Sequence, residues 1–281
     1  MKSSAPEKMP AEFVNDAAFK LKRFLLGPQR TRRTRLYGVG MPKSGTHSLA
    51  AMFFKGVRAG HEAGAMELID KILDRRAGRI SEGEMTAWLR ARDRELALEV
   101  DSASLNFWIL NILLREFSDA RFVLTLRDCY SSVNSYLNHL LRFPNADLWW
   151  LRMRELRLGP QAGDYEAGEE VLKEKNLHSL DAHFANWTAH NTQVLAEVPA
   201  ARLLVVRTDE IGQRVFEIAD FAGLPRRCVC PQRAHEFRNP AKQEIIRQID
   251  RDLLERKVEQ HCRPLMARFF PEIKSLDDAK L

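Results

Sequence analysis

The segment from Leu36 to Leu49 constrains the fold more than any other part of the chain, because it joins an apolar run to a Gly/Ser-rich turn and then to a helical pattern. It reads LYGVGMPKSGTHSL. In a strand–turn–helix unit of this kind, backbone N–H groups and the positive end of the helix dipole point to one place. Lys43 and the hydroxyl groups of the turn are close to that place in sequence. The segment therefore predicts a loop that binds phosphate or a similar anion.

The position of the lysine distinguishes this loop from the Walker A loop of nucleotide triphosphatases. In a Walker A loop, Lys-Ser/Thr follows the last glycine directly. Here Gly45 is followed by Thr46 and His47, and Lys43 lies two residues before the glycine. The pattern therefore disfavours a P-loop nucleotide or small-molecule kinase, which stays as an alternative. A lysine inside the loop suits a leaving group that carries phosphate beside the reacting centre.

A second strand-to-helix junction also suits an anion. The apolar run over residues 121–126 ends at Arg127, and the residues that follow have the apolar spacing of a helix. Ser135, eight positions after Arg127, would lie in that helix. Both side chains could therefore bind the same anion.

These two motifs resemble those of the PAPS-dependent sulfotransferases, which use 3′-phosphoadenosine 5′-phosphosulfate. The 5′-phosphosulfate loop of that family reads Pro-Lys/Arg-Ser/Thr-Gly-Thr-x-x-Leu, and the segment from Pro42 to Leu49 matches it throughout. The 3′-phosphate motif of the family is an arginine at a strand end with a serine eight positions later, as in Arg127 and Ser135. The resemblance extends from about Leu36 to Pro225.

The resemblance implies that PAPS is the co-substrate, that the bisphosphate PAP is the product, and that the donor site comprises Lys43, Ser44, Gly45, Thr46, His47, Ser48, Arg127 and Ser135. Many cytosolic members place an additional basic loop over the 3′-phosphate. This sequence lacks a clear counterpart, and Arg238 or Lys242 could substitute for it. Because a sulfuryl group carries less charge than a phosphoryl group, we expect no metal. Lys43 would then stabilise charge during the transfer as well as bind the donor.

The resemblance also suggests candidates for the base that deprotonates the acceptor. Several branches, including tyrosylprotein sulfotransferases and some bacterial carbohydrate enzymes, keep a catalytic glutamate after a glycine at about the distance at which Glu62 follows the loop. Glu62 is therefore the first candidate and His61 the second. Cytosolic members use a histidine after a later strand, where this sequence has Asp101 and Ser102; it also lacks the lysine found there in other branches. Two structural interpretations stay open, because Glu62 could pair with Arg58 and Asp101 could cap a helix.

Four apolar runs separated by long helical stretches predict the strands. They are Leu36–Val39, Leu96–Val100, Arg121–Leu126 and Arg202–Val206. This alternation predicts parallel crossovers and hence an α/β fold, a single domain with a central parallel sheet flanked by helices and a P-loop-like phosphate-binding loop after the first strand. Ligands of such sheets bind beyond the carboxyl ends of the strands, where Lys43 and Arg127 are expected.

The expected domain covers residues 36–270. It follows an N-terminal helical and basic lead over 1–35 and precedes a C-terminal tail over 271–281. We interpret the basic run from Arg30 to Arg35 as a solvated linker, and residues of about 143–180, which include the Trp149-Trp150 pair, as an insertion or lid on the acceptor side. Four histidines are interpreted as helix-surface or lid residues: His139, His178, His183 and His190.

Composition narrows the function less than the motifs do. The chain has 44 Lys+Arg against 38 Asp+Glu, a net charge of +6, which suits anionic partners in general. A non-catalytic nucleic-acid or membrane-surface binder is therefore the second alternative. No apolar run reaches the length of a membrane span, and the first residues lack the apolar core of a secretion signal, so we expect a cytoplasmic protein without stable membrane insertion.

Together these features predict an enzyme that transfers a sulfuryl group from PAPS to a hydroxyl of a small-molecule, carbohydrate or lipid acceptor. The expected mechanism is a metal-independent in-line transfer with a carboxylate base. We expect no nucleic-acid partner, and a homodimer is compatible with the sequence.

Overall fold

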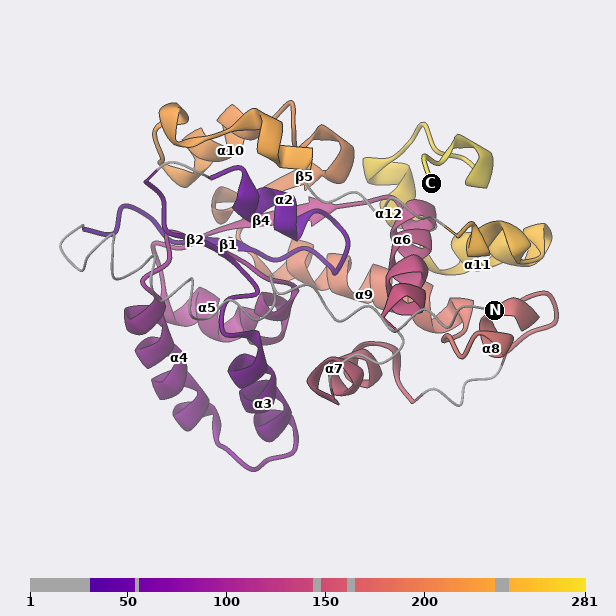
Figure 1. Ribbon diagram of the computed structural model, residues 1–281, viewed down its shortest axis with the longest axis horizontal. Coiled ribbons are helices and arrows are strands. Elements are labelled where there is room, and N and C mark those ends of the chain that lie inside the picture. Colours follow the sequence, from indigo (N-terminus) through magenta and orange to yellow (C-terminus); the bar gives the residue numbers. More distant parts are fainter. Residues whose placement is uncertain (1–30, 54–55, 144–147, 161–164, 236–242) are drawn as a thin grey trace, which may run out of the picture.

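Five short strands form one parallel sheet at the centre of the protein (Figure 1). The computed structural model describes residues 31–53, 56–143, 148–160, 165–235 and 243–281. The strands are β1 (Leu36–Gly38), β2 (Ala59–His61), β3 (Val100–Ser102), β4 (Arg121–Leu126) and β5 (Leu203–Arg207). Their order in the sheet is β2-β3-β1-β4-β5, and each neighbouring pair is parallel. The expected α/β fold with a central parallel sheet is confirmed.

Helices connect the strands and cover both faces of the sheet, with α2 and α10 on one face and α5 and α9 on the other (Figure 1). The helices are α2 (Thr46–Ala51), α3 (Ala65–Arg76), α4 (Glu82–Leu96), α5 (Leu110–Glu116), α6 (Cys129–Arg142), α7 (Leu148–Leu158), α8 (Glu170–Glu174), α9 (Leu180–Glu197), α10 (Val215–Ala222), α11 (Arg251–His261) and α12 (Arg263–Phe269). A 3₁₀-helix, η2 (Ser104–Ile109), follows β3.

The alternation of side chains along β1 explains why both faces are covered. Leu36 packs in a buried cluster with Leu49 of α2 and Ile218 of α10. The next residue, Tyr37, belongs to a separate cluster on the opposite face, which includes Val194 of α9. The central strand is therefore buried on both sides, and this packing fixes the position of the loop that leaves its carboxyl end.

The predicted strand from Leu96 to Val100 is wrong at its beginning. Helix α4 starts from a capping box between Ser81 and Glu84 and continues through Leu96. It ends where Ala97 takes a left-handed conformation, with φ of 45°, so that β3 begins only at Val100. The strands predicted near 36, 121 and 202 agree with β1, β4 and β5 to within one residue.

The basic run before β1 is not the solvated linker that the sequence suggested. Arg32 lies 2.6 Å from Asp93, and Arg33 lies 2.6 Å from the buried Glu99. These ion pairs hold the described part of the run against the domain. Residues 1–30, with the helix expected there, lie outside the described residues.

The segment after α12 also packs on the domain. It contributes to the same buried cluster as α6 and α9 through Ile273, Leu276 and Ala279. Residue 270 therefore does not mark the end of the packed structure. No helix in the described parts of the chain is both long and apolar enough to cross a membrane.

Candidate active site

The carboxyl ends of all five strands open on one cavity of about 680 Å³. Residues directly after each strand line it: the loop around Lys43 after β1, Glu62 after β2, Ser104 after β3, Arg127 after β4 and Thr208 after β5. This is the edge at which open parallel sheets bind ligands. The arrangement brings together predicted residues that are far apart in sequence, such as Lys43 and Arg127, which are 84 positions apart.

The loop between β1 and α2 approaches its neighbours so closely that two positions require glycine. A Cβ on Gly40 would lie 2.0 Å from Thr125 Oγ1 and 2.8 Å from the Thr125 carbonyl oxygen. Gly45 has φ of 102°, a conformation that glycine adopts without strain. It is also the N-cap of α2 and has no side chain to cap the helix, so the first N–H groups of α2 donate no hydrogen bond to a capping side chain.

Ser44 points into the protein and not into the cavity. Its Oγ donates to the Met41 carbonyl at 2.8 Å and pairs with Thr125 Oγ1 at 2.9 Å. Its carbonyl oxygen accepts from Thr208 at 2.6 Å. Ser44 does not line the cavity, whereas the predicted donor residues Lys43, Gly45, Thr46, His47, Ser48, Arg127 and Ser135 do. These contacts assign Ser44 to holding the loop in shape.

Two cations of the predicted donor site lie beside each other in the cavity. The Arg127 guanidinium donates from Nε to Ser131 Oγ at 2.9 Å and from Nη1 to the Lys43 carbonyl at 3.4 Å. Burial lowers the pKa of Lys43, and the nearby Arg127 lowers the same pKa further. Burial also lowers the pKa of Arg127. Among the described residues, no carboxylate lies within 4.0 Å of Arg127, so an anionic ligand would offset the cost of burying these charges.

Ser135 lies in α6 and lines the same cavity as Arg127. The strand end and the following helix therefore bring the two predicted 3′-phosphate residues to one space, as the spacing suggested. Arg238 and Lys242, the residues suggested to complete that site, lie outside the described residues.

Glu62 has an unsatisfied carboxylate oxygen in the cavity wall. Its Oε1 accepts from the Ser104 backbone N–H and from Ser104 Oγ, both at 2.9 Å, whereas Oε2 is buried and has no hydrogen-bond partner. Burial raises the pKa of Glu62, and the hydrogen bonds from Ser104 and the charge of Arg157 oppose that rise in pKa. The suggested pairing with Arg58 is not what holds Glu62, because Arg58 Nε donates to the Ala97 carbonyl at 2.6 Å.

The other two candidates for the base differ in whether they reach the cavity: His61 lines it and Asp101 does not. His61 Nδ1 lies 2.9 Å from the Ser102 carbonyl oxygen, which assigns the proton to Nδ1 and leaves the lone pair on Nε2. Burial lowers the pKa of His61 to about 4, so the ring is neutral near neutrality. Asp101 does not line the cavity and pairs with Arg92 at 3.1 Å. It is not a helix cap either, because η2 receives no side-chain cap.

Five residues of α6 and α7 also line the cavity: His139, Arg142, Trp150, Arg154 and Arg157. Trp150 falls in a segment expected on the acceptor side, and His139 was expected on a helix surface or lid, but the three arginines were assigned no role from the sequence. The i, i+4, i+7 spacing of Trp150, Arg154 and Arg157 was a usable signal, since it places them on one face of a helix. The interpretation of the histidines as surface or lid residues is wrong for three of the four: His178, His183 and His190 are buried, and His190 Nε2 lies 2.8 Å from the Val39 carbonyl oxygen.

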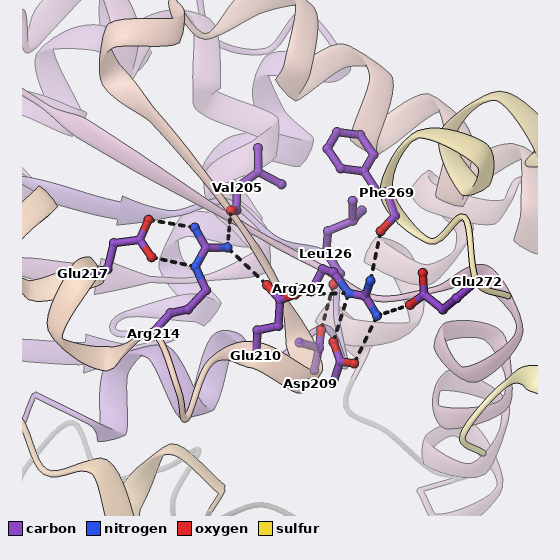
Figure 2. A network of polar contacts seen from close by, with 10 residues as sticks. Leu126, Val205, Arg207, Asp209, Glu210, Arg214, Glu217, Phe269 and Glu272 are labelled. Atoms are coloured by element: carbon purple, nitrogen blue, oxygen red, sulfur yellow. Dashed lines mark hydrogen bonds and ion pairs between the residues drawn. The ribbon is translucent and has the colours of Figure 1, made fainter.

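Arg207, at the end of β5, is a cation whose charge is neutralised by protein carboxylates (Figure 2). Arg207 pairs with Asp209 at 3.2 Å and with Glu272, and its Nη1 donates to the Phe269 carbonyl at 3.3 Å. These carboxylates raise the pKa of Arg207 although its burial opposes that rise. The network joins β5 to the segment after α12, and it leaves little uncompensated charge on that wall of the cavity.

No group of three or more His, Cys, Asp or Glu side chains within the described ranges is arranged to hold a metal ion. Several cations, the glycine-containing loop and five carboxylate side chains line the cavity: Glu62, Asp128, Asp209, Glu272 and Asp278. Of these described carboxylates, Glu62 has a buried oxygen without a hydrogen-bond partner. Such a set can bind a multiply charged anion and accept a proton beside it.

Comparison with known proteins identifies the family. A family model described as a sulfotransferase domain matches residues 35–214. Similar solved structures include a sulfotransferase from Alicyclobacillus acidocaldarius, at 16% identity over 85% of this chain and 96% of that chain, with a TM-score of 0.47. Another is the sulfotransferase domain of the Synechococcus PCC 7002 olefin synthase, at 14% identity over 76% of this chain and 83% of that chain, with a TM-score of 0.39. No curated protein sequence matches the chain. Because the family model spans more than half of the chain and all five strands, the chain belongs to the sulfotransferase domain family.

Proposed function

We propose that the protein transfers a sulfuryl group from PAPS to a hydroxyl of a small-molecule, carbohydrate or lipid acceptor. The observation that carries this proposal is the meeting of two kinds of group in one cavity. The loop around Lys43, with Arg127 and Ser135, forms what we call the nucleotide end. Glu62, Ser104 and the α7 residues Trp150, Arg154 and Arg157 form what we call the acceptor end.

The residues of the nucleotide end fit the two charged groups of PAPS. Lys43 and the uncapped N–H groups of α2 suit the 5′-phosphosulfate. Arg127 and Ser135 suit the 3′-phosphate. Arg127 has no carboxylate within 4.0 Å among the described residues, and it carries donors beyond those it uses toward Ser131 and Lys43.

In the proposed reaction, the acceptor hydroxyl oxygen attacks sulfur while its proton moves to Glu62 Oε2. The new O–S bond forms as the S–O bond to the 5′-phosphate breaks, and PAP leaves. Lys43 stabilises the negative charge that develops on the leaving phosphate. Glu62 suits the role of base because burial raises its pKa toward the working pH, and because Oε2 lacks the hydrogen bond that an acceptor hydroxyl would donate.

Thermal unfolding with and without PAP tests the donor site. In the absence of divalent metal, PAP at about 100 times its dissociation constant should stabilise the protein by about 2.7 kcal/mol. AMP, and ATP with Mg²⁺, should stabilise it much less because neither fills the 3′-phosphate site. An equal shift with ATP and Mg²⁺, or no shift with PAP, would contradict the proposed function.

A further inference from the structure

Helix α7 places two arginines in the cavity wall, and one of them, Arg157, contacts the serine that binds the proposed base. Arg154 and Arg157 both line the cavity, and Arg157 Nη2 donates to Ser104 Oγ at 3.1 Å. The same hydroxyl donates to Glu62. Since Glu62 and Ser104 follow β2 and β3, these arginines reach the cavity on one side of β1, whereas Arg127 follows β4 on the other side. Arg157 therefore meets the proposed base, and Arg127 the loop around Lys43.

Neither arginine has a carboxylate at ion-pair distance, within 4.0 Å, in the part of the chain that the structure describes, and Arg157 reaches Glu62 only through Ser104. Arg154 Nε is in addition buried without a hydrogen-bond partner. Arg207, on the wall at β5, has Asp209 and Glu272 as partners (Figure 2). Arg154 and Arg157 are both partly buried. Removing a cation from water without an ion-pair partner is costly, so a cavity wall with two such cations suits an anion that arrives with the substrate.

The surroundings of the arginines are partly apolar. Trp150 and Leu151 line the cavity from the same helix, as does Phe143 from the end of α6, and each is half-buried. Aromatic and aliphatic side chains of this kind bind the carbon skeleton of a ligand. A purely polar acceptor would leave them exposed to water.

On the basis of the proposed function, we infer that the acceptor is an amphiphilic hydroxy acid whose oxyanion binds Arg154 and Arg157. The oxyanion can be a carboxylate, a sulfate or a phosphate, because each presents the paired oxygens that a guanidinium binds. The hydroxyl of the same molecule then reaches Glu62, and its apolar body lies against the wall formed by Phe143, Trp150 and Leu151.

This arrangement also couples acceptor binding to the base. The charge of Arg157 lowers the pKa of Glu62. An oxyanion bound to Arg157 would cancel part of that charge, and the pKa of Glu62 would rise. A neutral acceptor would not have this effect, so the acid should be favoured in the chemical step as well as in binding.

The test compares 12-hydroxydodecanoate with its methyl ester, which has the same hydroxyl and no anion. Binding of each is measured by calorimetry on the full chain saturated with PAP. The acid should bind at least ~10-fold more tightly than the ester, as expected for charge-assisted hydrogen bonds. Equal affinities, or no binding of either compound, would overturn the inference. The PAP shift is a separate measurement, so its loss would count against the proposed function instead.

Variants on α7 locate the effect. Arg154→Gln should weaken binding of the acid by ~10-fold or more and leave the ester and PAP unchanged, and Arg154→Lys should recover part of the loss. The matched control is Arg152→Gln, which changes an exposed arginine of the same helix that does not line the cavity. Equal losses in the Arg152 and Arg154 variants, or an Arg154→Gln variant that binds the acid normally, would overturn the assignment.

Discussion

The nucleotide end and the acceptor end both use positive charge, but they are built differently. The nucleotide end is organised around the backbone of one short loop, to which Arg127 and Ser135 add their side chains. Gly40 and Gly45 allow a close approach and an unusual φ, and Ser44 holds the loop in shape. The acceptor end is formed by side chains from three separate elements, which meet where Arg157 contacts Ser104. The nucleotide end therefore constrains its ligand mainly through the backbone of a short loop. The shape of the acceptor end depends on how α7 packs against the rest of the domain.

A second difference lies in what each end leaves unsatisfied. At the nucleotide end, Arg127 already donates to Ser131 and to the Lys43 carbonyl. At the acceptor end, Glu62 Oε2 and Arg154 Nε are buried and have no partners. Unpaired buried groups cost stability, and in a folded protein they commonly mark functional positions. Acceptor-end substitutions should therefore act mainly on the rate of transfer, and loss of Arg127 at the nucleotide end mainly on the affinity for the donor.

The largest expected effect comes from Glu62→Gln. The substitution keeps the shape of the side chain and removes the base, so the maximal rate should fall by ~10²-fold or more. The affinity for PAP should stay unchanged, because Glu62 belongs to the other end of the cavity. Steady-state rates and PAP binding by calorimetry measure the two quantities.

Two further variants serve as comparisons for Glu62. Glu95→Gln changes an exposed glutamate of α4 that does not line the cavity and should retain full activity. His61→Ala should be milder than Glu62→Gln, since the His61 ring is neutral and its Nδ1 is engaged with the Ser102 carbonyl. An inactive His61 variant beside an active Glu62 variant would transfer the role of base to the histidine.

A smaller effect is expected at the nucleotide end from Arg127→Ala. Loss of a charge-assisted contact to the 3′-phosphate should weaken PAP binding by about 2 kcal/mol, or about 30-fold. Binding of adenosine 5′-phosphosulfate, which lacks the 3′-phosphate, should hardly change. Arg226→Ala is the control, because Arg226 is an exposed arginine paired with Asp220. A loss of equal size for both nucleotides would show that Arg127 acts on the loop and not on the 3′-phosphate.

The two ends also differ in how far the sequence could predict them. The loop from Pro42 to Leu49 and the pair Arg127 and Ser135 depend on local strand-to-helix junctions, whose residue types report the backbone directly. The arginines of α7 carry no such signal, because only tertiary packing decides whether one face of that helix meets Ser104 or solvent. The same reason explains the histidines: His190 was expected at a surface, but α9 packs on the sheet and turns it toward the Val39 carbonyl.

The strand boundaries show the same division between local and tertiary information. β4 coincides with its apolar run, whose five residues after Arg121 are all buried. The run around Leu96 misled because its first residues complete the last turn of α4, and pairing with β1 begins only at Val100. Apolar character alone did not distinguish the end of an amphipathic helix from the start of a short buried strand.

The smallest expected effect is a displacement of the pH profile in Ser104→Ala. Glu62 must be deprotonated to act as base, so the rate falls as the pH drops through its raised pKa. The Ser104 hydroxyl donates to the ionised carboxylate at 2.9 Å and thereby opposes the rise in pKa. Without it the pKa rises further, and the acid limb of the maximal rate should move to higher pH by up to about one unit, with the plateau unchanged. At a pH below the limb, the variant should be up to ~10-fold slower than the parent protein.

His61 cannot produce an acid limb near neutrality, since burial lowers its pKa to about 4. In a Glu62→Gln background the same substitution should leave the residual profile in place, and a limb that stays fixed or moves to lower pH in Ser104→Ala alone would show that another group titrates.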